Sequence, residues 1–328
     1  MVQSTSISVE RSQIVYINTG NEYFKARFGV KTYKLSLNGG MTCPNRDGKI
    51  DTRGCIFCSA GGSGDFAASP TLSITEQIEQ AKELIAGKVP KECKYIAYFQ
   101  AYTNTYAPIK YLRKIFYEAI ENEDIVALSI ATRPDCIDED IARLLYELGS
   151  IKPVFVELGL QTANETSAEF IRRGYNNAVF EDAVKLLSYN NGTGTGIDII
   201  VHMIIGLPGE TEADILKTVD YINRFPVKGI KFQLLHILSG TDLCDYYNIH
   251  KFRIFSLEEY THILLECILR LRPDIVIHRM TGDGPKKILS EPKWSGNKKL
   301  VLNHINNALR QQNIIQGENY VTFNKKST

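Results

Sequence analysis

Residues 33–64 read Tyr33-Lys-Leu-Ser-Leu37 and then Asn38-Gly-Gly-Met-Thr-Cys43-Pro-Asn-Arg-Asp-Gly-Lys-Ile-Asp-Thr-Arg-Gly-Cys55-Ile-Phe-Cys58-Ser-Ala-Gly-Gly-Ser-Gly64. An apolar strand is thus followed directly by a glycine-rich loop that holds three cysteines within sixteen residues. Thiolates ligate soft metals and iron-sulfur clusters, and glycine lets backbone N–H groups turn toward sulfur or an anion. The stretch predicts a strand that ends in a metal or cluster site.

Short apolar, β-branched runs alternate with amphipathic segments of helical period along the rest of the chain, which is typical of a parallel α/β fold. The predicted strands are 33–37, 95–100, 125–131, 153–159, 197–205 and 230–236, with 275–279 as a candidate seventh. Six or so β/α units are fewer than the eight of a closed barrel, so we expect an open, partial (β/α)6 TIM-like barrel. A doubly wound sheet is the alternative, and in either fold the strands' carboxyl ends share one rim.

Composition places the chain among ordinary globular proteins. It has 328 residues, 44% hydrophobic and 23% charged, which excludes a disordered, collagenous or coiled-coil chain. The net charge of +1 gives no overall field, but the segment from Lys286 onward carries eight Lys and Arg against two Glu. The start lacks a secretory pattern and no apolar run is long enough to span a bilayer, so we expect a cytoplasmic protein that does not bind membranes.

The three clustered cysteines allow more than one interpretation. The seven cysteines of the chain do not form the paired framework of a secreted scaffold, so free thiols are expected. A structural zinc site needs four ligands, and Cys93 and His202 lie far along the chain from the loop. Three free cysteines, zinc with a distant fourth ligand, and a four-iron cluster with one open iron remain the alternatives; the last suits the spacing best.

These residues resemble the radical S-adenosylmethionine (radical SAM) enzymes. Their signature, Cys-x-x-x-Cys-x-x-Cys, follows the first strand of a partial barrel and has an aromatic residue before the last cysteine, where this chain has Phe57. Here eleven residues separate the first two cysteines, and a widened first gap marks the branch of the Elongator catalytic subunit, which modifies wobble uridine in tRNA. The phrases Cys43-Pro-Asn-Arg-Asp-Gly48 and 98–105 are similar to a bacterial group close to that branch.

The resemblance implies that Cys43, Cys55 and Cys58 hold a [4Fe-4S] cluster whose open iron binds S-adenosylmethionine (SAM). Electron transfer from a donor such as flavodoxin or ferredoxin would cleave SAM to methionine and a 5'-deoxyadenosyl radical, which abstracts hydrogen from a substrate. The matched region defines a core domain over 23–285, with an N-terminal extension over 1–22 and a basic, helical C-terminal extension over 286–328.

The resemblance also implies SAM-binding residues at the rim: Phe57, Gln100, Thr103, Asn104, Arg133, Glu157, Gln161, His202 and Gly206. Arg133 offers a planar fork to the SAM carboxylate, although an Arg-Asp pair that closes the rim is the alternative. Glu157 lies in an apolar strand, so it needs a partner such as Arg133 or the cofactor. His202 has the simpler interpretation of a satisfied histidine inside the barrel.

Three functions remain open from the sequence. The leading hypothesis is tRNA modification at a wobble uridine side chain, with His236 as a candidate for substrate contact or proton transfer. Radical chemistry on a small metabolite is the second, because 202–210 also resembles the oxygen-independent coproporphyrinogen oxidases. A non-catalytic iron-sulfur or zinc regulator is the third. The basic segment around Trp294 either contacts RNA phosphate and stacks a base or forms a solvated helix face.

Overall fold

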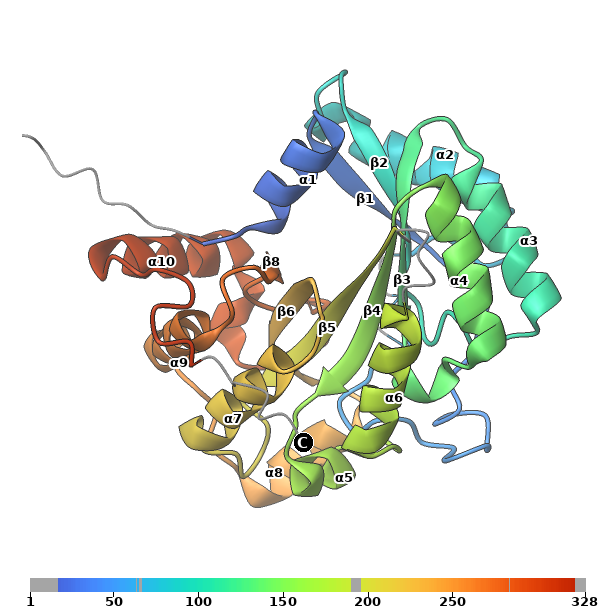
Figure 1. Ribbon diagram of the computed structural model, residues 1–328. Coiled ribbons are helices and arrows are strands. Elements are labelled where there is room, and N and C mark those ends of the chain that lie inside the picture. Colours follow the sequence, from blue (N-terminus) through green and yellow to red (C-terminus); the bar gives the residue numbers. More distant parts are fainter. Residues whose placement is uncertain (1–16, 63, 65–66, 190–195, 283, 322–328) are drawn as a thin grey trace, which may run out of the picture.

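The computed structural model describes residues 17–62, 64, 67–189, 196–282 and 284–321. Seven parallel strands form one curled sheet in the order β1-β2-β3-β4-β5-β6-β8. Their bounds are β1 (Thr32–Leu37), β2 (Lys94–Phe99), β3 (Ile125–Thr132), β4 (Val154–Gln161), β5 (Ile197–Ile205), β6 (Gly229–Leu234) and β8 (Val276–Arg279). The expected partial barrel is confirmed, and it includes the candidate seventh strand (Figure 1).

Helices cover the outer side of the curled sheet (Figure 1). They are α2 (Ile74–Ile85), α3 (Ile109–Ile120), α4 (Glu139–Ile151), α6 (Asn177–Ser188), α7 (Glu212–Asn223) and α9 (Leu257–Arg270). Capping boxes begin three of these helices, at Ser73 before α2, Thr211 before α7 and Ser256 before α9. The apolar stripe of each helix is buried against the strands; for example, the Phe116 ring lies 5.0 Å from that of Phe99 on β2.

Three shorter helices were not expected from the apolar pattern: α1 (Gly20–Phe28), α5 (Glu165–Phe170) and α8 (Asp242–His250). Each buries only two residues, so its sequence carries a weak helical period. Helices α5 and α8 lie together near the carboxyl end of β4 (Figure 1), where the Phe170 and Tyr246 rings are 4.9 Å apart. They form part of the rim where the sequence places the chemistry.

The C-terminal segment returns to the rim and then packs on the outside of the barrel. Strand β9 (Leu289–Glu291) pairs with β7 (Ile237–Leu238), and α10 (Lys298–Gln311) buries three residues in the main core. The Trp294 indole donates its Nε1–H to the carbonyl of Phe255 at 3.1 Å and packs 5.9 Å from the Tyr260 ring. Trp294 is therefore a packing residue and not a free platform for a base.

No helix in the described part of the chain is long and apolar enough to cross a membrane. Most of the N-terminal extension (1–16) and the final basic residues (322–328) lie outside the described residues.

Candidate active site

The cysteine loop folds over the rim beyond β1. Cys43, Cys55 and Cys58 line one cavity, which we call the cluster cavity. The Asn45 amide holds the loop in place, because its Nδ2 donates to the carbonyl of Arg172 at 2.7 Å and lies 3.5 Å from Cys55 Sγ. Arg46 Nη2 donates to the carbonyls of Cys58 and Ser59 at 3.2 and 2.7 Å, so a positive charge stays beside the sulfurs.

This donor set fits an iron-sulfur cluster. In the described residues, no three His, Cys, Asp or Glu side chains converge closely enough for a single metal ion. A cubane places each thiolate on a different iron, so its ligands stand farther apart than those of zinc. The hydrogen bond between the Cys55 and Cys58 thiols lowers the pKa of Cys55 to about 6 and raises the pKa of Cys58, so of these two thiols Cys55 loses its proton first. Gly62, at φ +55°, is needed because a Cβ there would lie 2.3 Å from the Tyr102 ring.

Most of the sequence-predicted site residues line the cluster cavity. Those that line it are Cys43, Cys55, Phe57, Cys58, Gln100, Thr103, Arg133, Glu157, Gln161 and His202. They come from the loops after β1, β2 and β3 and from strands β4 and β5. Gln161 adopts φ +68°, and its Oε1 is buried without a hydrogen-bond partner among the described residues.

Three predicted residues lie outside this lining. Asn104 is fully buried and donates Nδ2–H to the carbonyl of Ala131 at 2.8 Å, so its amide holds the loop after β2. Gly206, at φ +99°, lines a separate cleft after β5, and a Cβ there would lie 3.4 Å from the Phe255 ring. His236 lies two residues beyond the end of β6, because that strand stops at Leu234 and not at residue 236.

His236 lines a second cavity, which we call the side cavity. Gly282 and Gly284 close against its ring, since a Cβ on either would lie 2.5 Å from a ring atom. The two cavities share six lining residues: Phe57, Cys58, Gln100, Ile204, Gln233 and Arg279. The cysteine loop therefore borders two adjacent cavities that share part of their lining.

The Arg133 guanidinium forms an ion pair within its own loop. Its Nε and Nη2 donate to the two carboxylate oxygens of Asp135 at 2.9 and 2.8 Å. Its guanidinium also lies 5.0 Å from the centre of the Tyr175 ring. Arg133 is not the partner of Glu157, so the expected pairing of these two residues is wrong.

Glu157 is instead the centre of a polar network inside the barrel. Its carboxylate, with no exposed side-chain surface, accepts from Lys34 Nζ at 2.5 Å and also pairs with Lys231 Nζ. The Ser129 and Tyr98 hydroxyls donate to it at 2.6 and 3.0 Å. Burial opposes ionisation, but the two ammonium groups outweigh it and hold the pKa of Glu157 well below its usual range. The network closes the floor of the cluster cavity.

His202 connects this floor to the cavity wall. Its Nε2 lies 2.7 Å from Glu157, and its Nδ1 lies 3.2 Å from Gln233 Nε2. Burial, reinforced by the charge of Lys231, lowers the pKa of His202 to about 4. The neutral ring therefore donates from Nε2 and accepts at Nδ1, which turns the amide nitrogen of Gln233 toward it. The interpretation of His202 as a satisfied interior histidine agrees with these contacts.

We expect the stability of the protein to fall as the pH drops from about 6.5 toward 4. His202 is neutral in the fold but titrates near pH 6.5 when unfolded, so protonation favours the unfolded chain in this window. Urea unfolding at pH 7, 6 and 5 measures the loss, and His202→Gln should make it shallower without removing it, because burial also lowers the pKa of His278, to about 3. An unchanged pH slope in His202→Gln would contradict this assignment.

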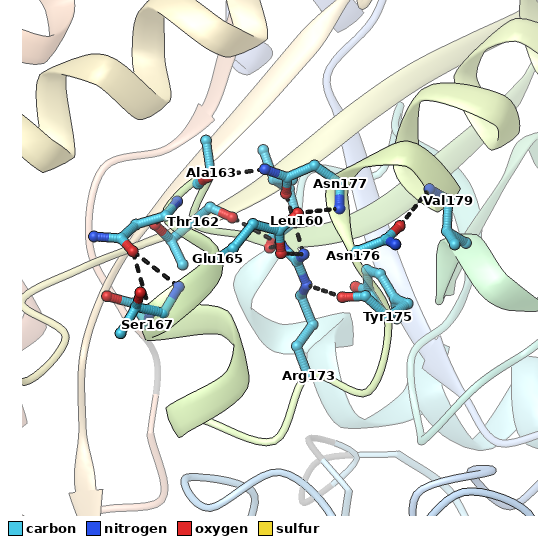
Figure 2. Close-up of polar contacts among 12 residues, drawn as sticks. Leu160, Thr162, Ala163, Glu165, Ser167, Arg173, Tyr175, Asn176, Asn177 and Val179 are labelled. Atoms are coloured by element: carbon cyan, nitrogen blue, oxygen red, sulfur yellow. Dashed lines mark hydrogen bonds and ion pairs between the residues drawn. The ribbon is translucent and has the colours of Figure 1, made fainter.

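Arg173 organises the loop after β4 and was missed by sequence reasoning. Figure 2 shows its buried guanidinium at the centre of the turn, donating to the carbonyls of Leu160, Thr162 and Tyr175 at 3.1, 2.8 and 2.8 Å. It also reaches the Glu165 carboxylate at 3.0 Å and the Asn177 side chain at 3.1 Å. Lys34, Lys231 and Arg279 were missed as well, since isolated cations in strand segments carry no motif.

Comparisons with known proteins agree with this geometry. The family model of the radical SAM superfamily matches residues 51–222, and the model of the radical SAM C-terminal domain matches residues 227–311. The protein YtqA of Bacillus subtilis is 37% identical over 327 residues, which covers 100% of this chain and 99% of that protein. The threonylcarbamoyladenosine tRNA methylthiotransferase MtaB of Aquifex aeolicus is 28% identical over 124 residues, or 38% of this chain and 28% of that enzyme.

Among solved structures, archaeal Elp3 from Methanocaldococcus infernus superposes with a TM-score of 0.58 at 18% identity. The alignment covers 84% of this chain and 63% of that one, and it supports the fold alone. From the family models and the near full-length match, we conclude that the chain belongs to the radical SAM superfamily, whose members use a [4Fe-4S] cluster and SAM.

Proposed function

We propose that this enzyme modifies tRNA, at the side chain of a wobble uridine, and that Cys43, Cys55 and Cys58 hold its cluster. The observation that carries the proposal is the pair of joined cavities beside the three thiols. One cavity carries the predicted SAM-binding residues, and the other leaves room for a substrate group next to Phe57 and Cys58.

When bound, the cluster and SAM supply the electron and the 5'-deoxyadenosyl radical that abstracts a hydrogen atom, with flavodoxin or ferredoxin as the reductant. The protein binds and orients the cofactors and the substrate, and it excludes water from them. Asn45 and Arg46 fix the cysteine loop, and Gln100, Thr103 and Gln161 offer polar groups to the amino acid and ribose of SAM. The buried Glu157 network seals the floor of the cavity against bulk water.

Three observations support tRNA as the substrate. The widened first gap of the cysteine loop resembles the branch that contains the Elongator catalytic subunit, and the segment 98–105 resembles a bacterial group close to that branch. A partial relative, MtaB, is named for its action on tRNA. Lys286 and Lys287 are exposed and directly follow Pro285, which lines the side cavity, and two exposed positive charges next to the lining in the chain suit contact with an RNA backbone.

The test is reconstitution of the cluster under anaerobic conditions, followed by measurement of 5'-deoxyadenosine with SAM and a reductant. We expect tRNA from a strain lacking the gene to raise its formation at least several-fold, because substrate binding couples SAM cleavage to hydrogen abstraction. The control is tRNA from the parent strain, in which the modification is already present. Equal formation with both tRNAs, together with identical tRNA nucleosides in the two strains, would overturn the proposal.

A small metabolite is the second candidate substrate. The side cavity favours it in one respect, because Gly282 and Gly284 close tightly on His236 and leave a confined space. In that case 5'-deoxyadenosine forms at a rate that no tRNA changes, and removing the charges of Lys286 and Lys287 leaves turnover unaffected. The same assay therefore separates the two candidates.

A further inference from the structure

Four arginines line the cluster cavity, and three of them are already satisfied by the protein. Arg46 donates to two backbone carbonyls and Arg133 is held by Asp135. Arg173 donates to carbonyls and side chains of its own loop. Arg279 differs, because its half-buried guanidinium has no hydrogen-bond or ion-pair partner among the described residues. It is also the only one of the four that lines the side cavity.

A register shift directs Arg279 toward the interior. In the β6–β8 pairing, Ile230 lies opposite Ile277, but Lys231 lies opposite Arg279, so His278 is the extra residue of an irregularity. Bulges of this kind re-aim a side chain and are common beside active sites. The shift places two cations at neighbouring positions of adjacent strands, an arrangement that is unfavourable without an anion nearby.

The described residues supply too little negative charge to balance Lys34, Lys231 and Arg279. Glu157 is the one carboxylate that pairs with Lys34 and Lys231, and its oxygens also accept from His202, Ser129 and Tyr98. Lys231 has only 4% of its side chain exposed, so solvent does not screen it well. Arg279 is left without a counter-charge at the junction of the two cavities, where its planar fork suits a carboxylate or a phosphate.

We propose that Arg279 binds an anionic group of the substrate, a carboxylate or a phosphate, in the side cavity. The Gln233 amide lies in the same lining and, because its nitrogen is turned to His202, leaves its oxygen available to a donor on the same substrate. The site borders Phe57, Cys58 and Gln100, which line both cavities, whereas Cys43, Cys55, Arg133 and Gln161 line the cluster cavity and not the side cavity. The inference rests on the proposed function only in assigning the side cavity to a substrate.

The first test uses phenylglyoxal, which labels accessible guanidinium groups, with acetate and methyl phosphate as probes at constant ionic strength. The full-length protein, with its cluster and SAM bound, is labelled and analysed by peptide mass spectrometry. We expect one of the anions to slow labelling of Arg279 several-fold and to leave Arg224 unchanged, because Arg224 is exposed on the surface and outside both cavities. Equal rates at Arg279 with and without both anions would overturn the proposal.

The second test separates a substrate site from a SAM site. Arg279→Gln removes the charge but keeps a polar side chain, and Arg224→Gln removes an exposed charge outside both cavities as the matched control. We expect Arg279→Gln to weaken substrate tRNA at least tenfold, about the loss of one charge-assisted contact, while the Kd of SAM changes little. A loss of SAM affinity, or an equal loss of tRNA affinity in the two variants, would contradict the assignment.

Salt dependence identifies the source of the anion. If Arg279 contacts an RNA phosphate, Arg279→Gln lowers the slope of log Kd against log salt by about 0.7 to 0.9 for every RNA tested. If it contacts a carboxylate on the base, the slope is kept and discrimination between tRNA from the deletion strain and from its parent is lost. Protection of Arg279 by acetate or phosphate without any effect of tRNA would uphold the anion site and overturn only the tRNA proposal.

Discussion

Replacing Cys55 with alanine is expected to abolish both cluster assembly and SAM cleavage. The three thiols of the cluster cavity are its only cysteines, and with one removed two thiolates are left for a cluster that needs three protein ligands. Cys55 is also the thiol whose pKa is lowered to about 6. The measurements are iron and sulfide content, visible absorbance after anaerobic reconstitution, and 5'-deoxyadenosine formed in a single incubation.

The matched control for this variant is Cys93→Ala. Cys93 is a half-buried cysteine just before β2 that lines neither cavity, so its removal should leave iron content and SAM cleavage near those of the wild type. Cys43→Ala and Cys58→Ala should behave like Cys55→Ala. A Cys55→Ala protein that keeps its iron, or a Cys93→Ala protein that loses it, would contradict the assignment of the three cysteines.

The parallel sheet could be predicted because its central strands, such as β3 and β4, are buried on both faces and read as largely apolar runs between helical stripes. The end of β6 could not be predicted from the sequence. The run Leu234-Leu235-His236-Ile237 remains apolar, but the chain leaves the sheet after Leu234 to form β7 and pair with β9. Strand β7 pairs with a segment about fifty residues later in the chain, and the local sequence around β6 does not predict this pairing.

The cysteine loop was predictable because its ligands are close in the sequence, whereas the Glu157 network was not. Its lysines lie on β1 and β6, and only the curl of the sheet brings Lys34 and Lys231 to the same carboxylate. Sequence reasoning recognised that Glu157 needs a partner but considered only the rim residue Arg133 and the cofactor. Arg279 was overlooked for a similar reason, since the register shift that directs it inward is a property of the β6–β8 pairing.

Replacing Glu157 with glutamine is expected to lower the free energy of unfolding by about 3–5 kcal/mol, the usual cost of breaking a buried ion pair. The amide keeps the shape of the side chain but leaves the buried ammonium of Lys231 without a counter-charge. Urea unfolding at pH 7 measures the loss. The matched variant is Glu157→Gln with Lys231→Met, which removes both charges and should recover part of the stability that the single variant loses.

The pH dependence gives an independent check on the same carboxylate. Because the pKa of Glu157 is lower in the fold than in the unfolded chain, its contribution is fully present above about pH 4.5 and is lost as the pH falls toward the folded pKa. Glu157→Gln should therefore flatten the stability profile below pH 4.5 and leave the His202 window between pH 6.5 and 4.5 sloping. If Glu157→Gln is as stable as the wild type at pH 7 and loses stability in the same way below pH 4.5, the barrel does not depend on Glu157 to neutralise its interior lysines.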